Sequence, residues 1–534
     1  MIKNYNSFNL FVLIVENELL FLINVNKMAL KYKFDRKGHK LVEHCAVFGV
    51  VCSDINYSIT KLLYSGLIAQ QHRGQESTGI SLIKSGGSIY TYKKKGLVSR
   101  VLNNKVLSKL WGNVGIGHNR YATTGAQEYD SLEYIQPYHF KNNEIEFSLA
   151  FNGTIPNYHE LKQQLEAMGR IFLTNTDTEV IAQLLAYTAK ETDNWPEILK
   201  KVSKSLDGSY SLLILTSESD IYAVRDPLGF KPLCIGEMIA KERKHYIVSS
   251  ESCGIDVVGG NLLRDVRPGE IIHLNTEKGI HSEMVIESER TALCQFEFVY
   301  FARPDSIIDG VSVAQTRLQL GINLAKNDPI LTDPHFRENT IVVPVPDSGR
   351  SVALGYAQEA NLPYVEGLMK NRYIWRTFIM PGQEKREAAV KEKLNPIKNF
   401  VEGKNVILLD DSIVRGTTTK KIINLIREAG ALSVNVRISC PPVIRPCYMG
   451  IDFPTTSELI AGHFKELYGN EAYIDEIRKK IGADSLRYQT IEDLMKAIGK
   501  GKDQLCMACL TGIYPLKSVN KIIELEKAIS SNRN

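Results

Sequence analysis

Residues 406–418 read VILLDDSIVRGTT, and this stretch decides the fold of the second half of the chain. An apolar run is followed by two adjacent acids, Asp410 and Asp411, then by a turn containing Gly416, and then by a helical segment. Such a turn presents free backbone N–H groups and the positive end of a helix dipole, which together can seat a phosphate. The acids lie where open α/β sheets bind ligands and can hold sugar hydroxyls there. The plainer interpretation is a solvated acidic turn before a capped helix.

Alternating strands and helices surround this stretch. The predicted strands are TIVVPVP (340–346), PYVEGL (363–368) and SVNVRIS (433–439), and the predicted helices are SVALGYAQEA (351–360) and TTTKKIINLIREAG (417–430). Fully apolar strands that alternate with helices predict a parallel sheet flanked by helices. The terminal segment 466–534 is predicted to be helical.

The first half has a different rhythm. From Cys45 to about residue 290, short β-type runs such as AVFGVV (46–51) and HYIVSS (245–250) are separated by turn signals. Two helices fit between them, at 55–71 and at 177–190. Many strands with few helices predict a sandwich of sheets, and the change of rhythm places the domain boundary near 285–300.

Bulk properties bound the function. A chain of 534 residues suggests two domains, and a net charge of +5 without a basic stripe argues against a nucleic-acid binder. Nine scattered cysteines indicate a reducing compartment, so we expect a cytoplasmic protein. Glu16, Asn17 and Glu18 interrupt the apolar run 8–25, which is therefore not a membrane span. Met28 opens a polar stretch typical of a protein start, so residues 1–27 are interpreted as a mis-assigned start.

The thirteen-residue stretch 406–418 resembles the phosphoribosyl pyrophosphate motif of the type I phosphoribosyltransferases. The resemblance implies that Asp410 and Asp411 bind the ribose and, with Ser348 of the loop PVPDSGR (344–350), one Mg²⁺ per subunit. It also implies a set of further phosphoribosyl pyrophosphate ligands: Ser412, Arg415, Gly416, Thr417, Thr418 and Arg372. In the loop 371–383 and the charged stretch after it, Arg372, Arg376, Lys385 and Arg386 could close over a pyrophosphate, or could form a solvated loop. Trp375 departs from the smaller residue usual there.

The first half resembles the glutaminase domain of the N-terminal-nucleophile amidotransferases, through four polar segments that follow Cys45. These segments are QHRGQES (71–77), GHNRYATTG (117–125), FNGTIPN (151–157) and NTDTE (175–179). The resemblance implies an αββα sandwich and removal of the leader 1–44, so that Cys45 is both nucleophile and, through its α-amine, general base. It assigns Asn152 and Gly153 to the oxyanion hole, and Arg120, Asp177 and Arg73 to glutamine binding. Ala46 replaces the usual glycine. If Cys45 were considered without these four segments, a buried structural cysteine would be the usual interpretation.

The two halves in this order resemble the iron–sulfur branch of the amidophosphoribosyltransferase family. The resemblance implies a glutaminase domain at 45–290, a phosphoribosyltransferase domain at 291–465 and a helical segment at 466–534. It implies synthesis of 5-phosphoribosylamine from glutamine and phosphoribosyl pyrophosphate, with purine nucleotides as inhibitors and a homotetramer. It also assigns a [4Fe–4S] cluster to Cys294, Cys447, Cys506 and Cys509. A four-cysteine zinc site has the same ligand count and stays an alternative.

Two rival functions remain open from the sequence. A glutamine-fed sugar-phosphate isomerase would share the first half but needs isomerase domains in place of the stretch 406–418. A ligand-sensing regulator would keep the sugar-phosphate fold, lack an intact nucleophile and carry a DNA-binding helix pair, and neither of the last two features is found.

Overall fold

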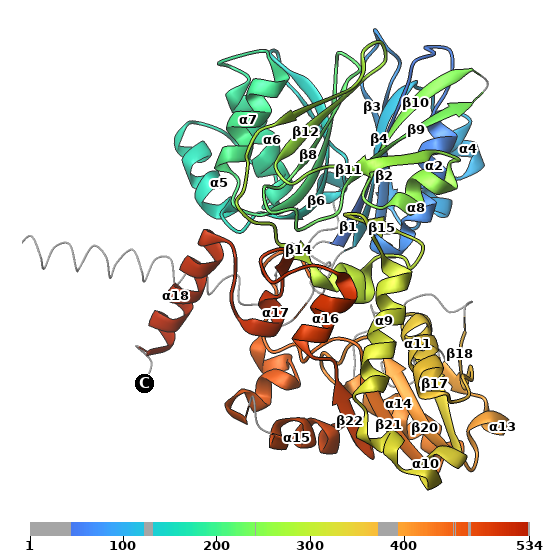
Figure 1. Ribbon diagram of the computed structural model, residues 1–534. Helices are drawn as coiled ribbons and strands as arrows, with labels where there is room; N and C mark the ends of the chain where they lie inside the picture. Colours follow the sequence, from blue (N-terminus) through green and yellow to red (C-terminus); the bar gives the residue numbers. More distant parts are fainter. Residues whose placement is uncertain are drawn as a thin grey trace, which may run out of the picture.

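The computed structural model describes residues 44–121, 132–240, 242–371, 394–451, 453, 455–467 and 471–531. The first half contains two antiparallel sheets stacked face to face (Figure 1). The seven-stranded sheet has the order β11 (Asn261–Asp265), β9 (Cys234–Ala240), β10 (Arg243–Ser249), β1 (His44–Cys52), β4 (Val114–Tyr121), β2 (Ser77–Ile83) and β3 (Tyr90–Lys95). The six-stranded sheet has the order β13 (Gly279–Met284), β12 (Glu270–Asn275), β8 (Ile221–Arg225), β7 (Ser209–Thr216), β6 (Glu146–Thr154) and β5 (Tyr138–Lys141).

Helices cover the outer face of each sheet and complete four layers. The helices α2 (Thr60–Ala69) and α8 (Ser252–Val257) lie on the seven-stranded sheet, and α5 (Tyr158–Ala167), α6 (Asp177–Thr188) and α7 (Trp195–Ser205) lie on the six-stranded sheet (Figure 1). Val47 and Leu213 are among the buried apolar side chains that fill the space between the sheets. The predicted αββα sandwich is therefore confirmed. Helix α6 begins close to its predicted start because the Thr176 hydroxyl caps it by accepting from the N–H of Glu179.

The second half is built on a parallel sheet with the order β17, β20, β21, β22. These strands span Thr340–Pro344, Asn405–Asp410, Ser433–Ile438 and Ser485–Tyr488. Side chains alternate between the two faces: Ile407 packs with α9 (Val313–Lys326) and α11 (Arg350–Ala360), while Leu408 packs with α14 (Thr417–Glu428) and α15 (Glu471–Ile481). The predicted parallel-sheet domain is confirmed.

Two secondary-structure predictions in this half are wrong. The segment 466–534 is not purely helical, because Ser485–Tyr488 is the fourth strand of the parallel sheet, so the sheet reaches past the predicted domain limit at 465. The predicted strand 363–368 is not continuous: Tyr364 forms an isolated bridge with Val342, and Leu368 is the first residue of the short strand β18. The strand Ser485–Tyr488 escapes prediction because four residues between helices are too few to show the alternating pattern of a strand.

Short elements complete the chain. The remaining helices are α3 (Val98–Val101), α4 (Asn104–Leu107), α10 (Pro334–Glu338), α13 (Lys398–Val401), α16 (Ile491–Ile498), α17 (Ala508–Thr511) and α18 (Lys517–Ser531). The remaining strands are β14 (Leu293–Cys294), β15 (Ile307–Ile308), β16 (Val311–Ser312), β18 (Leu368–Lys370), β19 (Leu394–Pro396) and β23 (Leu505–Cys506). The 3₁₀ segments are η1 (Gln71–Arg73), η3 (Leu132–Tyr134), η5 (Pro329–Thr332), η6 (Thr456–Glu458) and η7 (Ala461–Leu467), and η4 (Glu297–Phe301) is a π-helix. Across the described ranges, no helix combines the length and the apolar character needed to cross a bilayer.

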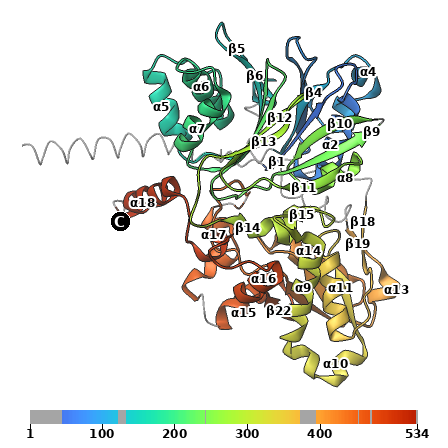
Figure 2. The same ribbon diagram turned by 45° about the horizontal axis from the view of Figure 1, so that its top comes forward.

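The two halves meet along the lower edge of the sandwich. Figure 2 shows β14, β15 and α9 directly below the sheets, with α16 and α17 beside them. Strand β14 pairs with β23 in parallel, so residues 293–294 contact residues 505–506. The junction therefore combines the segment that follows the sandwich with the end of the chain.

Candidate active sites

The predicted nucleophile lies at the start of the central strand of the seven-stranded sheet. Cys45 is fully buried in β1 and is paired with Arg120 of β4. The N–H of Cys45 donates to Oδ1 of Asn152 at 3.3 Å, across to the six-stranded sheet. Cys45 and Arg120 therefore meet through strand register, and Asn152 through sheet stacking, although these residues are far apart in the sequence.

Asn152 has the geometry of an oxyanion donor. Because its Oδ1 accepts from Cys45, its Nδ2 points elsewhere, and this buried atom has no hydrogen-bond partner among the described residues. A buried unpaired donor is costly unless a ligand completes it. The next residue, Gly153, admits no side chain, because a Cβ there would lie 2.0 Å from the carbonyl oxygen of Ser209. A carbonyl oxygen of a substrate beside the Cys45 thiol would suit the free Nδ2.

The two predicted glutamine-binding residues Arg120 and Asp177 are buried at the same end of the sandwich. Arg120 is 3% exposed, and its guanidinium lies 4.0 Å from the carboxylate of Glu76. Asp177 is the first residue of α6, and its carboxylate accepts from the N–H of Ile155 at 3.4 Å. Ile155 directly follows β6, which carries Asn152, so Asp177 is fixed beside the end of that strand. A cationic and an anionic group are thus both present for an α-amino acid.

His118 is excluded as a base for Cys45. It lies on β4, fully buried, and its Nε2 contacts the carbonyl oxygen of Phe151 at 3.0 Å. Burial lowers the pKa of His118 to about 3, so the ring stays neutral at ordinary pH. Since the carbonyl can only accept, Nε2 carries the proton, and the low pKa makes the other ring nitrogen, Nδ1, a very weak base. This leaves a base role for the Cys45 α-amine, as the resemblance implies.

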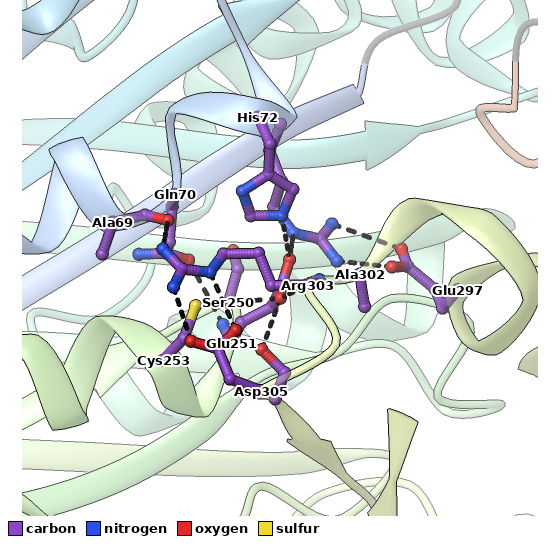
Figure 3. A network of polar contacts seen from close by, with 12 residues as sticks. Ala69, Gln70, His72, Ser250, Glu251, Cys253, Glu297, Ala302, Arg303 and Asp305 are labelled. Carbon is purple, nitrogen blue, oxygen red and sulfur yellow. Dashed lines mark hydrogen bonds and ion pairs between the residues drawn. The ribbon is translucent and has the colours of Figure 1, made fainter. Parts of the chain in front are cut away.

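Arg73 has a different role from the predicted one. Its side chain is 1% exposed, and its guanidinium is shared between the carboxylates of Glu251 and Glu297. All three guanidinium nitrogens donate to these two acids, so the positive charge of Arg73 is already paired at the junction of the two halves. Figure 3 shows Glu251 at the centre of this network, between His72 and Arg303. We therefore correct the prediction: Arg73 supports the junction of the two halves.

The paired acids of the second half lie at the carboxyl end of β20, as predicted. Asp410 and Asp411 are 8% and 6% exposed, and burial raises the pKa of both carboxyls. The charge of Asp411 raises the pKa of Asp410 further. Hydrogen bonds from Ser348 and Ser412 lower the pKa of Asp411. Because Ser348 follows β17 and Asp411 follows β20, the bond between these two residues joins the two loops. Two close carboxylates with oxygen donors beside them are a suitable seat for a hard divalent cation.

The predicted phosphate loop is open to solvent. Gly416 caps α14 with φ +77, a left-handed conformation, and a Cβ there would lie 2.6 Å from Ile460. Thr417 and Thr418 are exposed in the first turn of α14. Arg415 is also exposed, and it pairs with Glu458 at 3.2 Å. Hydroxyls and free backbone N–H groups thus gather at a helix start, which favours a phosphate. Arg372, Trp375, Arg376, Lys385 and Arg386 lie outside the described residues, as does the leader up to residue 43.

One further residue of this site carries no local sequence signal. Arg317 of α9 is 2% exposed, and its positive charge lowers the pKa of Asp411 against the effect of burial. Its guanidinium donates to the carbonyl oxygens of Phe298 and Ala302. Neither partner is close in the sequence to Asp411, so only the fold shows the relation.

The four predicted cluster cysteines gather at the junction of the halves. Cys294 pairs with Cys506 through β14 and β23, and nearby charges on Cys294, Cys447 and Cys506 would each raise the pKa of the Cys509 thiol further above its ordinary value, which burial already raises. Cys447 Sγ accepts backbone N–H groups from residues 449 and 451 at 3.3 and 3.4 Å. Within the described ranges, however, no group of three or more His, Cys, Asp or Glu side chains is arranged to hold a metal ion. The thiols fit a cluster in number, burial and mutual approach, but they are not arranged as ligands around a common centre.

The other four cysteines lie inside the protein, as structural cysteines usually do. Cys52, Cys234, Cys253 and Cys440 are all buried.

Comparisons with known proteins cover both halves. Residues 118–256 match the family described as a glutamine amidotransferase domain. The amidophosphoribosyltransferase of Methanocaldococcus jannaschii is 45% identical over 485 residues, which is 88% of this chain and 97% of the relative. The amidophosphoribosyltransferase of Bacillus subtilis is 42% identical over 480 residues, 89% of this chain and 94% of the relative.

Two solved structures agree with these relatives. Glutamine phosphoribosylpyrophosphate amidotransferase from B. subtilis, complexed with ADP and GMP, superposes with a TM-score of 0.77 at 41% identity, over 89% of this chain and 98% of that one. A structure described as the allosteric regulatory enzyme of purine biosynthesis gives a TM-score of 0.78 at 41% identity, over 89% and 96% of the two chains. Both similarities extend across the sandwich and the parallel-sheet half.

Proposed function

This chain belongs to the amidophosphoribosyltransferase family, and from that premise we propose that Cys45 releases ammonia from glutamine while the loop after β20 binds the phosphoribosyl acceptor. The enzyme is a pentosyltransferase with glutamine amidohydrolase activity, and it makes 5-phosphoribosylamine, glutamate and pyrophosphate at the start of purine synthesis. The predicted family and function are confirmed, and the sugar-isomerase and regulator alternatives are set aside. The residue assignments below are our proposal.

The observation that carries the glutaminase assignment is the contact of Cys45 with Asn152. After removal of the leader, the nitrogen that now donates to Oδ1 of Asn152 at 3.3 Å is an α-amine. This amine takes the proton of the Cys45 thiol, and the sulfur attacks the amide carbon of glutamine. The oxyanion that forms accepts from Nδ2 of Asn152 and from the backbone of Gly153. The C–N bond then breaks, ammonia leaves with the returned proton, and water hydrolyses the thioester to glutamate.

Arg120 and Asp177 orient the substrate in this scheme. The guanidinium of Arg120 binds the α-carboxylate of glutamine, and the carboxylate of Asp177 binds its α-ammonium. Both side chains are nearly buried, which strengthens their attraction for a zwitterion. Their separation along the site fixes which end of glutamine faces the thiol.

In the second half, Asp410 and Asp411 face the ribose, and the loop from Ser412 to Thr418 binds the 5′-phosphate. Ammonia attacks C1 of the sugar, the bond from C1 to the pyrophosphate oxygen breaks, and the amine loses a proton. The buried carboxylates stabilise the electron-deficient carbon as this bond breaks. A passage inside the protein carries ammonia between the sites, because free ammonia is protonated in water at neutral pH.

Ser348, Asp410 and Asp411 are the residues that would hold Mg²⁺. Their donors are all oxygens, and burial, which raises the pKa of both carboxyls, makes a neutralising cation favourable beside their charged forms. When bound, Mg²⁺ neutralises the pyrophosphate that leaves.

Cys294, Cys447, Cys506 and Cys509 would hold the [4Fe–4S] cluster. Backbone N–H groups directed at a cysteine sulfur, as at Cys447, are a feature that tunes such clusters. The alternative is zinc, and the two are distinguished by the visible absorption and acid-labile sulfide of the anaerobically purified protein. Colourless protein with one zinc per chain would refute the cluster.

Regulation and assembly follow the family in our proposal. The B. subtilis structure is described as complexed with ADP and GMP, and we propose purine nucleotides as inhibitors of this enzyme too. We also propose a homotetramer in the cytoplasm.

Two nitrogen sources test the function on the full enzyme. Transfer to phosphoribosyl pyrophosphate is measured with glutamine and separately with ammonium chloride, in the wild type, Cys45→Ala and Asp411→Asn. We expect Cys45→Ala to lose only the glutamine-dependent reaction. Asp411→Asn should slow both transfers to a similar extent while it still hydrolyses glutamine. Glutamine-dependent transfer that survives Cys45→Ala would overturn the proposal.

A further inference from the structure

One buried cation of the sandwich ends at the junction without an acidic partner. Lys231, in the loop between β8 and β9, is 1% exposed. Its carbonyl oxygen accepts from Nε of Arg225 at 2.8 Å, which fixes its backbone beside the end of β8. Across the described ranges, no oxygen forms a hydrogen bond or an ion pair with Nζ of Lys231. A buried lysine charge without a counter-ion is strongly unfavourable, so we expect an anion that the side chains alone do not supply.

The acids of the surrounding segments bind other groups. Both carboxylate oxygens of Asp226, in the same loop as Lys231, accept from backbone N–H groups. Asp309, between β15 and β16, forms two hydrogen bonds of 2.8 Å with the guanidinium of Arg225. Neither acid forms an ion pair with Lys231, so the counter-ion must be of another kind.

The side chain of Lys231 ends beside the turn that surrounds one of the four predicted cluster cysteines. A Cβ on Gly450 would lie 3.0 Å from Nζ of Lys231 and 3.3 Å from its Cε. Gly450 lies between residues 449 and 451, whose N–H groups donate to Sγ of Cys447 at 3.3 and 3.4 Å. The same Cβ would lie 3.1 Å from the hydroxyl of Thr154, which is neutral and cannot balance a charge. The ammonium therefore lies between the end of β6 and the Cys447 turn.

The backbone next to Lys231 holds a second of these cysteines. The N–H of Cys294 donates to the carbonyl oxygen of Phe230 at 3.4 Å, and Phe230 directly precedes Lys231. Cys294 in turn pairs with Cys506 through β14 and β23. Burial raises the pKa of the Cys294 thiol, and the positive charge of Lys231 acts in the opposite direction. Lys231 thus approaches the cysteines from two sides, with its side chain at Cys447 and with its backbone at Cys294.

A metal centre with four thiolate ligands would carry the missing negative charge. Four thiolates contribute four negative charges, and a dipositive core, whether Zn²⁺ or an oxidised [4Fe–4S] core, leaves an excess of two. In a buried site this excess is poorly screened by water, and a nearby ammonium stabilises it. The unpaired cation and the four buried thiols are therefore complementary.

We infer that Lys231 is the internal counter-ion of the metal centre held by Cys294, Cys447, Cys506 and Cys509. The inference rests on the four-cysteine centre of the proposed function. Lys231 contacts neither substrate and is not a ligand of the metal. Its charge favours the thiolate form of the ligands, so the metal is retained longer. In a cluster, the same charge also favours an added electron and raises the reduction potential.

The test compares Lys231→Met with the wild type in the full enzyme, purified without oxygen. Methionine has a flexible apolar side chain that can fill the space of the lysine without its charge. Iron, zinc and acid-labile sulfide are measured first in each protein. A cluster is then titrated with dithionite, and its reduced form is followed by electron paramagnetic resonance. We expect Lys231→Met to lower the equilibrium constant for reduction by roughly tenfold, which is about 59 mV for one electron.

A zinc centre calls for a different measurement, because zinc does not change its oxidation state. The rate of metal release to a chelator is then compared in the two proteins. Removal of a group outside the ligand shell commonly weakens metal binding by 10- to 100-fold, and we expect roughly tenfold faster release from Lys231→Met.

Lys93→Met is a matched control for the loss of a partly buried lysine. Lys93 lies on β3, at the edge of the seven-stranded sheet, and its Nζ donates to the carbonyl oxygens of Ile135 and Pro137. This lysine is therefore already bonded within the sandwich. Lys93→Met should keep the wild-type reduction potential and the wild-type rate of metal release.

An unchanged potential and an unchanged rate of release in Lys231→Met overturn the inference, as does an equal change in Lys93→Met. If Lys231→Met does not fold, Lys231→Gln removes the same charge and keeps an amide that can bond the hydroxyl of Thr154. Wild-type behaviour of the centre in Lys231→Gln would refute the counter-ion role. A fall in the kcat of glutamine hydrolysis with an unchanged centre would also refute it, and would assign Lys231 to the oxyanion side of β6.

Failure of the centre itself is distinguishable from failure of the counter-ion. Wild-type protein that contains neither iron with sulfide nor zinc refutes the four-cysteine centre and, with it, the role of Lys231. A centre that is present and insensitive to Lys231→Met refutes the role of Lys231 alone. Glutamine hydrolysis and transfer from ammonia are measured separately in the same samples, so the proposed enzyme function is tested independently of both.

Discussion

The two candidate sites differ in how far they are shielded from water. In the sandwich, Cys45 and Asn152 are fully buried and Arg120 is 3% exposed. In the parallel-sheet half, Arg415, Thr417 and Thr418 are exposed. The sandwich site binds its substrate with side chains from strands whose pairing fixes them. The other site uses loops at strand ends, which are accessible to a large phosphorylated ligand.

This difference in exposure to water matches the reaction that each half carries out. Amide attack depends on a thiol, an amine and an amide donor fixed within the contact of Cys45 and Asn152, and burial strengthens each electrostatic contribution there. Sugar-phosphate binding depends on backbone N–H groups and hydroxyls at the start of α14, which function while hydrated. Substitutions at the sandwich site should therefore strongly lower the rate of transfer from glutamine alone. Substitutions at the acids of β20 should lower the rates of transfer from glutamine and from ammonia, and by a smaller factor.

The largest expected effect is that of an uncleaved leader. A protein that begins at Cys45 is compared with one in which an uncleavable residue precedes it. The second should lose glutaminase activity by roughly 10²- to 10⁴-fold, because an amide nitrogen cannot act as the general base. Steady-state hydrolysis of glutamine measures the loss. Ammonia-dependent transfer in both proteins is the control, and equal glutaminase rates would contradict the α-amine mechanism.

Asn152→Ala should have the next largest effect. Removal of one oxyanion donor costs roughly 10²- to 10³-fold in kcat. The KM for glutamine should change little, since Arg120 and Asp177 bind the other end of the substrate. Asn119→Ala is a matched control, because Asn119 is equally buried but donates to the carbonyl oxygen of Leu67. A rise in KM with an unchanged kcat for Asn152→Ala would instead assign the side chain to substrate binding.

The sequence predicted the second site more fully than the junction. Residues 406–418 are contiguous, so the strand, the acids and the helix start are signalled locally, and β20 and α14 follow as predicted. The sandwich site required four separate segments, and a resemblance had to join them. What brings Cys45 to Arg120 is the register of β1 and β4, which no local pattern encodes.

The junction network escaped the sequence for the same reason, to a greater degree. Glu251 and Glu297 lie 178 and 224 positions from Arg73, and acids in polar segments are normally solvated. The motif QHRGQES therefore suggested a substrate-binding arginine, although the fold gives its guanidinium to two carboxylates. A clue existed in the spacing of polar residues in the otherwise apolar segment 292–302, but its partner could not be named.

Asp410→Asn tests the open site. The substitution removes one of two buried charges, and the electron-deficient carbon of the ribose loses part of its stabilisation. Transfer should fall by roughly 10- to 100-fold, which corresponds to about 1.4–2.8 kcal/mol in the barrier. The same loss should appear with glutamine and with ammonia, while glutamine hydrolysis without the acceptor persists. A loss limited to glutamine would show that Asp410 acts on the sandwich instead.

The smallest expected effect is on stability, at the buried His118 of the sandwich. Burial lowers its pKa to about 3 in the folded protein, against about 6.5 when unfolded. The unfolded chain alone therefore takes up a proton as pH falls below about 6.5, and stability is lost progressively down to about pH 3. Between pH 7 and pH 5 this loss is about 2 kcal/mol. The described histidines of the parallel-sheet half, His335 and His463, are exposed. Histidine burial should therefore not make the stability of that half depend on pH.

His118→Gln isolates that contribution, because a glutamine amide can still donate to the carbonyl oxygen of Phe151 but does not titrate. Urea unfolding at pH 7 and pH 5 gives the change in unfolding free energy for each protein, and all other groups cancel in the difference. The wild type should lose about 2 kcal/mol more than the variant. His335→Gln, at an exposed position on α10, should behave as wild type. If wild type and His118→Gln lose equal stability, His118 takes up a proton in the folded protein. The conclusion that the sandwich site is shielded from water would then be wrong.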